Sequence, residues 1–448
     1  MDAAGWRLVV KVLVLTLGTR GDVQPFVALA KGLLRSGHDV VVAAPERFAD
    51  FVAGHGVAFA ALDDGPLRLM DGGSAVGDVA SGGLRARVAL ARRLPAMFSR
   101  VLEDCWSVAS TGTGAGADVV VHNGQVIAGQ HVAEKLGVPA VLALPLPMYV
   151  PTRDFPWPGQ DLLAGLPKWL NRTTYLGMKG PALMFGQTVD RWRRTLGLPR
   201  RAGRHDPLRR PGGGAVPVMH AVSRHVLARP GDWPTTATMT GYWFLDDADP
   251  HAMDAPAPSG PTGQSGLPAD LEAFLDSGEP PIFVGFGSMS GSDPVGTTEA
   301  VLAATQRARV RAVLATGWGG LVADRARDDV FVLGEVPYAE LFPRVAAVVH
   351  HGGAGTTGAA VAAGRPQVIC PFVADQPFWG RRMHVLGVAP APIDQRRLSP
   401  AELASAIRRV LDEQTFASKA EGLGALVRDE DGVMNAVELL EKVDGSTG

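Results

Sequence analysis

One stretch of the sequence combines histidines, glycines and hydroxyl groups at a predicted strand-to-helix junction. It runs from Val348 to Thr357 and reads VVHHGGAGTT. Glycines let a backbone approach a ligand closely, and the N–H groups and dipole of the following helix favour an anion, typically a phosphate. His351 could donate a further hydrogen bond to a phosphate oxygen. The alternative is a tight turn that binds nothing.

A carboxylate and an amide stand side by side after the next predicted strand. Asp375 and Gln376 fall where another helix begins. Together they offer several hydrogen-bond acceptors and two donors, which suits the hydroxyl groups of a sugar. The alternative is that Asp375 only caps its helix, and the two roles are compatible.

A second carboxylate follows the first predicted strand, Leu8 to Leu17. Asp22 is the candidate general base and Thr19 a supporting hydroxyl, because a carboxylate at the mouth of an apolar cleft has a raised pKa and accepts a proton more readily. The alternative is an ordinary helix cap. His122 and Asn123 end another strand of the same half, so they should face the same cleft, with His122 as a rival base or an acceptor-pocket residue.

Buried strands alternate with amphipathic helices along both halves of the chain, which predicts an α/β fold. Each half opens with a strand, a glycine-containing turn and a helix, at Gly18 and again at Gly287. We therefore expect two tandem Rossmann-like, doubly wound domains with a cleft between them. The domains span 1–245 and 268–424, the Asp/Ala/Pro/Gly/Ser-rich stretch 246–267 links them, and 425–448 forms a last amphipathic helix.

Composition narrows the function classes. The 448 residues carry 43 Lys and Arg against 45 Asp and Glu, a net charge of −2, which disfavours a nucleic-acid-binding protein. Two cysteines exclude a disulfide framework, and no residue cluster has metal-ligand spacing. Without an apolar span or a signal peptide we expect a cytoplasmic protein, and the Ala, Gly and Arg bias is typical of a high-GC bacterial source.

The motifs together resemble those of a known enzyme family. HGGAGTT from His351 followed by Asp375-Gln376 resembles the donor signature of nucleotide-sugar glycosyltransferases of the GT-B fold. GTRGDVQP from Gly18 resembles a motif of the sterol 3-beta-glucosyltransferases and related actinomycete antibiotic glycosyltransferases. The segments Glu134–Pro139 and Pro145–Pro156 are also similar to the sterol enzymes. The resemblance covers nearly the whole chain and leaves the acceptor open.

This resemblance implies a donor site in the second domain and an acceptor site in the first, with the last helix packing back on the first domain. The donor's diphosphate, sugar and nucleotide base would be held by Ser288, Val336, His351, Gly353, Ala354, Gly355, Thr356, Asp375 and Gln376. Ala359 stands where many relatives carry a ribose-binding Glu, so the choice between UDP and dTDP donors is open. The family needs neither a metal nor an organic cofactor.

The predicted function is therefore an inverting, metal-independent hexosyl transfer to a hydroxyl of an apolar small molecule, a sterol, triterpenoid or polyketide. UDP-glucose is the expected donor and a dTDP-deoxysugar the alternative. A sugar-nucleotide epimerase and a non-catalytic binding protein are the rivals from other classes. Phe155 and Trp379 are candidate acceptor-pocket residues, with packing in the core as the alternative. The arginine-rich helix expected over Leu84–Trp106 predicts either a transient membrane-surface contact or an ordinary solvated face.

Overall fold

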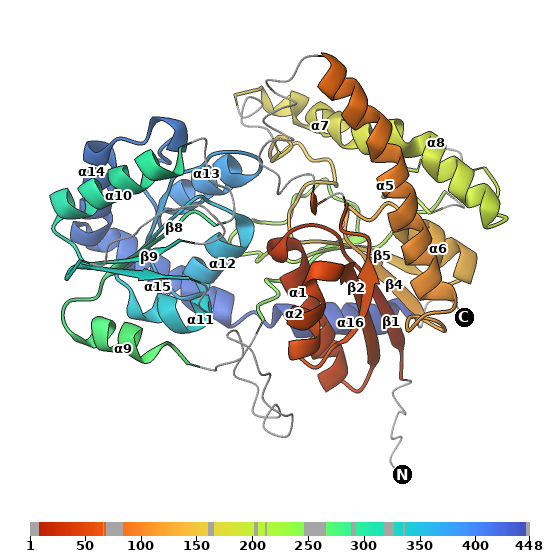
Figure 1. Cartoon of the computed structure of the whole chain (residues 1–448), viewed down its shortest axis with the longest axis horizontal. Helices are drawn as coiled ribbons and strands as arrows, with labels where there is room; N and C mark the ends of the chain where they lie inside the picture. The colour runs from red at the N-terminus through yellow and green to blue at the C-terminus, as the bar shows by residue number, and fades with distance from the viewer. Residues whose placement is uncertain are drawn as a thin grey trace, which may run out of the picture.

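Two parallel β-sheets, each with helices on both faces, make up the computed structural model (Figure 1). The structure describes residues 9–65, 67–68, 84–159, 165–200, 205–210, 213–245, 266–287, 293–316, 327–334 and 337–444. The two sheets match the predicted pair of doubly wound α/β units. The predicted linker, 246–267, lies almost wholly outside the described residues, so the proposed domain boundaries remain a prediction.

Within the described residues the first sheet has seven strands in the order β3-β2-β1-β4-β5-β6-β7, all parallel. The strands are β1 Lys11–Leu15, β2 Asp39–Pro45, β3 Ala58–Leu62, β4 Val119–His122, β5 Ala140–Leu144, β6 Val218–His220 and β7 Ala237–Met239. The helical segments of this half are α1 Arg20–Arg35, η1 Glu46–Phe48, α2 Ala49–Gly54, α5 Leu84–Ser110, α6 Gly129–Leu136, η3 Lys168–Leu170, α7 Asn171–Thr174, η4 Tyr175–Lys179 and α8 Gly180–Thr195.

The second sheet has five described strands in the order β10-β9-β8-β11-β12, again all parallel. They are β8 Ile282–Gly285, β9 Ala312–Ala315, β10 Val330–Leu333, β11 Ala347–His350 and β12 Gln367–Ile369. The helical segments around them are α9 Ala269–Asp276, α10 Pro294–Ala308, α11 Tyr338–Leu341, η6 Phe342–Arg344, α12 Ala354–Ala362, α13 Gln376–Leu386, η7 Gln395–Arg397, α14 Pro400–Asp412 and α15 Gln414–Arg428.

Alternate residues of the central strands build separate hydrophobic cores on the two faces of each sheet. Val12 and Val14 of β1 join the core under α1, whereas Leu13 and Leu15 join the core under α5, α6 and α8. This explains why the strand reads as a continuous apolar run, since both of its faces are buried. In such sheets ligands bind at the carboxyl ends of the strands, which is where the candidate residues lie.

The last helix, α16 Gly432–Asp444, packs on the first half of the molecule, where it crosses α1 (Figure 1). Val433 and Val437 belong to the core under α1, and a Cβ added at Gly32 would lie 2.2 Å from Val433 Cγ1. At the first residue of α16, a Cβ on Gly432 would lie 2.2 Å from the Tyr242 carbonyl oxygen. The chain therefore returns to the first half through a backbone-to-backbone contact that only glycine permits.

Candidate functional site

Asp22 lies in the first turn of α1, directly after the loop that follows β1. Its Oδ2 accepts hydrogen bonds from the Thr19 backbone N–H (2.8 Å) and the Thr19 hydroxyl (3.1 Å), and its Oδ1 accepts one from the Gln125 amide (3.2 Å). Gly18, at φ 127°, makes room for this arrangement, because a Cβ there would lie 2.3 Å from Asp22 Oδ2. Thr19 is the N-cap residue of α1, and Asp22 completes a capping box with it, so Asp22 supports the cap without being the N-cap that the alternative expected.

The cap does not exclude a role as base. Burial raises the pKa of Asp22 above its usual value, and the hydrogen bonds from Thr19 and Gln125 oppose that rise. The side chain is only half-buried, so it is not sealed from solvent. A partly accessible carboxylate with a raised pKa is suited to take a proton from a hydroxyl group.

Gln125 is a residue of this site that the sequence reasoning missed. It is held by Asn123, whose Oδ1 accepts from the Gln125 backbone N–H (3.2 Å) and whose amide donates to Gln125 Oε1 (3.3 Å). Asn123 also donates to Thr16 Oγ1 (3.0 Å), and the Thr16 hydroxyl donates to the Asp22 carbonyl (2.8 Å). These bonds form a closed ring that fixes Asp22. The one signal in the sequence for Gln125 was its place shortly after β4, the strand that lies next to β1 in the sheet.

His122 and Asn123 differ from the expectation that they line an acceptor pocket. Both side chains are buried, with exposed fractions of 2% and 3%. The His122 ring packs against α6, where a Cβ on Gly129 would lie 2.2 Å from it, and its Nδ1 lies 3.0 Å from the Asn123 carbonyl. The structure therefore gives both residues internal contacts, and Asp22 is the more accessible candidate base.

The glycine-rich turn after β11 surrounds the imidazole of His351 with backbone. A Cβ would lie 3.1 Å from His351 Cε1 if added at Gly287, and 2.5 Å from Nε2 if added at Gly353. Burial lowers the pKa of His351 to about 4, and the Gly285 backbone opposes the shift, although Nδ1 has no hydrogen bond of good geometry within the described residues. His351 is therefore neutral at pH 7, beside the start of α12.

His350, the last residue of β11, holds the turn through a hydrogen bond to its backbone. Its Nδ1 accepts a hydrogen bond from the Gly352 N–H (3.0 Å) and its Nε2 lies 2.8 Å from Gln367 Oε1, so Nε2 carries the proton. Burial lowers its pKa to about 3. Gly352 has φ 90°, a conformation that favours glycine. Gly353 is the N-cap of α12 and provides no side-chain cap, so the N–H groups of Ala354, Gly355 and Thr356 begin the helix without one.

Asp375 precedes α13 but does not cap it with its side chain. Its Oδ2 instead accepts a hydrogen bond from the indole N–H of Trp379 (2.8 Å). Burial raises the pKa of Asp375 to about 6, and the negative charge of Asp22 adds to the rise while the Trp379 hydrogen bond opposes it. A half-buried carboxylate held by one indole keeps acceptor capacity for a ligand, which the helix-cap interpretation did not anticipate.

Trp379 differs from its predicted place in an acceptor pocket. It is fully buried, with an exposed fraction of 0%, so it positions Asp375 rather than lining an open surface. Gln376 is also buried, and its Oε1 accepts from the N–H groups of Phe372 (2.8 Å) and Val373 (3.1 Å). The amide oxygen of Gln376 thus holds the loop that presents Asp375.

The carboxyl ends of the two sheets face each other across this site. Asp22 and Asp375 are close enough for their charges to interact, although they belong to different sheets. Phe155, which follows β5, lies with its ring 5.4 Å from that of Phe378 on α13. The structure therefore brings the candidate base, the candidate sugar-binding carboxylate and the candidate acceptor residue Phe155 into one region.

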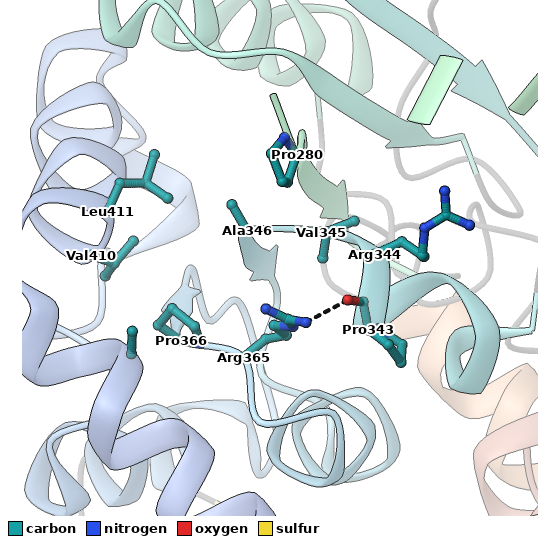
Figure 2. A pocket seen from close by; sticks show the side chains of 10 residues that line it. Pro280, Pro343, Arg344, Val345, Ala346, Arg365, Pro366, Val410 and Leu411 are labelled. Carbon is teal, nitrogen blue, oxygen red and sulfur yellow. Dashed lines mark hydrogen bonds between the residues drawn. The ribbon is translucent and has the colours of Figure 1, made fainter. Parts of the chain in front are cut away.

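A separate cavity of about 330 Å³ lies at the opposite, amino-terminal edge of the second sheet (Figure 2). Pro280, Ala346 and Pro366, which precede β8, β11 and β12, are among its lining residues. It contains none of the candidate residues.

Ser288 and Val336 lie outside the described residues, so their predicted donor contacts remain predictions. The side chains of 84–93 lie outside them too, so the predicted membrane contact of α5 also remains a prediction. The described part of the chain has no cluster of three His, Cys, Asp or Glu side chains suited to a metal, and no helix there has the length and apolar character needed to cross a bilayer.

Two family models match the chain. Residues 12–152 match the glycosyltransferase family 28 N-terminal domain, and residues 321–430 match the erythromycin biosynthesis protein CIII-like C-terminal domain. The second match ends just before α16.

Plant and fungal proteins are similar over almost the whole chain. Sterol 3-beta-glucosyltransferase UGT80B1 of Arabidopsis thaliana is 32% identical over 96% of this chain and 68% of its own length, and UGT80A2 of the same plant is 34% identical over 96% and 65%. The chain spans only 26% of the sterol 3-beta-glucosyltransferase of Debaryomyces hansenii, which is 30% identical over 95% of this chain. These relatives give no support to the bacterial source that composition indicates.

Solved glycosyltransferase structures share the fold. The glycosyltransferase of kitacinnamycin superposes with a TM-score of 0.68 at 16% identity, covering 98% of this chain and 100% of the other. Glycosyltransferase VinC, solved in complex with dTDP, superposes with a TM-score of 0.64 at 18% identity, covering 97% and 99%. These structures match both halves of the chain in one molecule, as the GT-B arrangement requires.

Proposed function

Because the chain belongs to the glycosyltransferase family that includes the sterol 3-beta-glucosyltransferases, we propose that it transfers a hexose from a nucleotide diphosphate sugar to a hydroxyl group of an apolar small molecule. One observation carries this proposal: the Phe155 ring, after β5 of the first half, lies 5.4 Å from the Phe378 ring on α13 of the second half, so Asp22 and Asp375 lie in one region and their charges interact. In this proposal a base of the first half therefore works beside a sugar-binding carboxylate of the second half.

Asp22 acts as the general base in this proposal. It takes the proton of the acceptor hydroxyl while that oxygen attacks the anomeric carbon and the bond from this carbon to the diphosphate breaks. The attack comes from the face opposite the leaving group, so the configuration of the sugar inverts. Thr19 and Gln125 hold the carboxylate through both of its oxygens. Together they fix its direction before the substrate arrives.

The second half binds the donor. The N–H groups at the start of α12 and the neutral imidazole of His351 donate to the diphosphate, whose negative charge grows as the bond breaks. Asp375 accepts hydrogen bonds from the sugar hydroxyls. Ser288 is proposed to contact the diphosphate, and Val336 is proposed to contact the nucleotide base. No metal or organic cofactor takes part in this proposal, since helix dipole and imidazole hold the leaving charge.

For the substrates we propose UDP-glucose as the donor and a sterol or triterpenoid as the acceptor, because the two Arabidopsis thaliana relatives are sterol 3-beta-glucosyltransferases. A dTDP-linked deoxysugar and a polyketide are the alternative pair, suggested by the dTDP bound to VinC. Ala359 lies half-buried in α12 at the place of the ribose-binding Glu of many relatives, so it gives no preference for either nucleotide.

The test compares wild type with Asp22→Asn, using UDP-glucose or dTDP-glucose with a panel of sterols and polyketide aglycones and detecting hexose adducts by mass spectrometry. Asn preserves a helix cap but cannot take the proton. We expect a loss of about 10²- to 10⁴-fold in turnover with unchanged donor binding. Asp118→Asn is the matched control, because Asp118 also accepts a hydrogen bond from a backbone N–H, that of Lys11 (2.7 Å), but lies at the opposite, amino-terminal edge of the same sheet.

Each other outcome has a clear meaning. An adduct that forms equally fast with Asp22→Asn would reject Asp22 as the base. Conversion of the donor without any acceptor would favour an epimerase. Donor binding without turnover, across both nucleotides and the whole panel, would favour a binding protein and overturn the proposal.

A further inference from the structure

Tyr149 lies in the loop that follows β5, and its hydroxyl donates a hydrogen bond to the Gly124 carbonyl (2.7 Å). Gly124 is the middle residue of 123–125, which we call the Gln125 turn. We propose that Tyr149 is a positioning residue: it fixes the Gln125 turn and, through Gln125, sets the direction of the Asp22 carboxylate. The inference rests on the proposed function, because a fixed carboxylate matters for the proton transfer proposed there.

The Tyr149 ring holds the turn by packing as well as by its hydroxyl. A Cβ added at Gly124 would lie 2.2 Å from Cε2, 2.3 Å from Cζ and 2.5 Å from the hydroxyl oxygen of Tyr149. Real Cβ atoms essentially never approach another atom closer than 3.0 Å. Gly124 does not have a positive φ, so the contact with Tyr149, rather than its backbone conformation, accounts for a glycine at this position.

The Gln125 turn has two anchors and one contact with the carboxylate. Asn123 ties its first residue to the end of β1 by donating to the Leu17 carbonyl (2.7 Å), and Tyr149 holds its middle. Gln125 ends the turn and donates to Asp22 Oδ1 (3.2 Å). Because a hydrogen bond weakens steeply with poor distance and angle, a small shift of the turn would weaken this contact.

Tyr149 lies near Asp22, although no hydrogen bond joins the two side chains in the described part of the chain. Burial raises the pKa of the Tyr149 phenol, and the negative charge of Asp22 adds to the rise. The phenol therefore stays protonated where carboxylates titrate, as its bond to a carbonyl requires, since a carbonyl can only accept. The charge of Tyr149 is constant, so it acts on Asp22 through position.

Other charged groups around Asp22 come from two further elements. Asp375, just before α13, is close enough for the two carboxylate charges to interact. Arg20 precedes Asp22 on α1, donates to Gln24 (3.2 Å) and lies 4.9 Å from the centre of the Phe51 ring. The substitution Tyr149→Phe leaves these charges in place and keeps the ring, so it removes the hydroxyl alone.

Loss of the Tyr149 hydroxyl should raise the pKa of Asp22. The Gln125 hydrogen bond lowers that pKa, so a looser turn removes part of the lowering. A hydrogen bond to a charged group corresponds to about one to two pKa units, and a bond weakened by half to about 0.5 to 1. We expect a rise of that size in Tyr149→Phe.

The test measures the pKa of Asp22 without any substrate, by NMR titration of the full chain labelled with ¹³C at its aspartate carboxyl groups. Asp22→Asn identifies the signal. Tyr175→Phe is the matched control, because Tyr175 is buried in the hydrophobic core on which Tyr149 packs, and its hydroxyl has no hydrogen-bond partner within the described residues. We expect this control to leave the pKa of Asp22 unchanged.

A second background shows whether the effect passes through Gln125. In a Gln125→Leu protein, Tyr149→Phe should cause no further rise in the pKa of Asp22, whereas independent effects would add. An unchanged or lowered pKa in Tyr149→Phe would overturn the proposal. An equal rise in Tyr175→Phe, or a full further rise in the Gln125→Leu protein, would overturn it too.

Turnover separates this proposal from the catalytic one. Where a transferred hexose is detected, the acidic limb of the kcat/KM profile of Tyr149→Phe should move to higher pH together with the pKa measured by NMR. We expect kcat to fall about threefold to tenfold and the KM for the donor to stay the same. A limb that stays in place while the pKa of Asp22 rises would reject Asp22 as the base and leave the positioning role of Tyr149 standing.

Discussion

Replacing Trp379 with Phe tests how Asp375 is kept ionised. The Trp379 indole donates a 2.8 Å hydrogen bond to Asp375, whose pKa burial has already raised to about 6. A hydrogen bond to a charged group contributes about 1.5–3 kcal/mol, which corresponds to about one to two pKa units. Without that bond, we expect the Asp375 pKa to rise to between about 7 and 8.

The consequence is a loss of donor affinity that depends on pH. Asp375 is about 90% ionised at pH 7 when its pKa is about 6, and about 50% to 10% ionised when the pKa is about 7 to 8. If only the ionised form accepts hydrogen bonds from the sugar, UDP-glucose binding at pH 7 should weaken about two- to tenfold. The loss should disappear near pH 9, where both proteins are ionised.

Calorimetric titration of UDP-glucose between pH 5 and 9 measures this directly and does not involve Asp22 as base. Trp233→Phe is the matched control, because Trp233 is buried in the same hydrophobic core but donates to the Val150 carbonyl rather than to a carboxylate. A weakening that is equal at every pH would show that Trp379 acts through packing alone. If the pH at which donor affinity falls by half is the same in both proteins, that pH does not report the ionisation of Asp375, and the reasoning is refuted.

Three further predictions concern other parts of the molecule. Gln125→Leu removes a hydrogen bond that lowers the pKa of Asp22, so the acidic limb of the kcat/KM profile should move to higher pH, and an unmoved limb would contradict the base assignment. Gly432→Ala places a methyl group 2.2 Å from the Tyr242 carbonyl and should cost about 1–3 kcal/mol in urea unfolding, whereas Gly422→Ala, with open space around it, should cost nothing. Burial lowers the pKa of His220 to about 3, below its unfolded value of about 6.5, so stability is full above pH 6.5 and falls by about 1.4 kcal/mol per pH unit below it. His220→Phe should flatten the pH dependence of unfolding by that amount, and an unchanged slope would refute the neutral-histidine assignment.

Apolar runs and helical periodicity were sufficient to predict the central strands and most long helices. The strand expected over Leu8–Leu17 contains β1, and the helix expected over Leu84–Trp106 is α5. Strands β3 and β7 were missed, because they are short and the edges of a sheet carry less of the continuous apolar pattern. The helix α15 was missed because its two glycines and three alanines weaken the helical pattern of large apolar residues.

The site was predicted less completely than the fold. Motifs at strand ends identified Asp22, His351 and Asp375, which the structure brings to facing sheet edges. They did not reveal that Gln125 holds Asp22, since that contact joins residues 103 positions apart and depends on β4 lying beside β1. They placed Trp379 on a pocket surface, because an aromatic residue near a motif does not show which way its ring faces.

The packing of α16 has a practical consequence for building chimaeric enzymes. Donor preference is an attractive property to exchange between relatives, and the sequence invites a simple transplant of everything after the linker. Such a transplant would also replace Val433 and Val437, whose partners are in α1 of the recipient. A graft that ends near Asp431 and keeps the recipient's own α16 would leave both that interface and the Gly241–Gly432 backbone contact intact. The modular unit for donor exchange is therefore shorter than the second half of the chain.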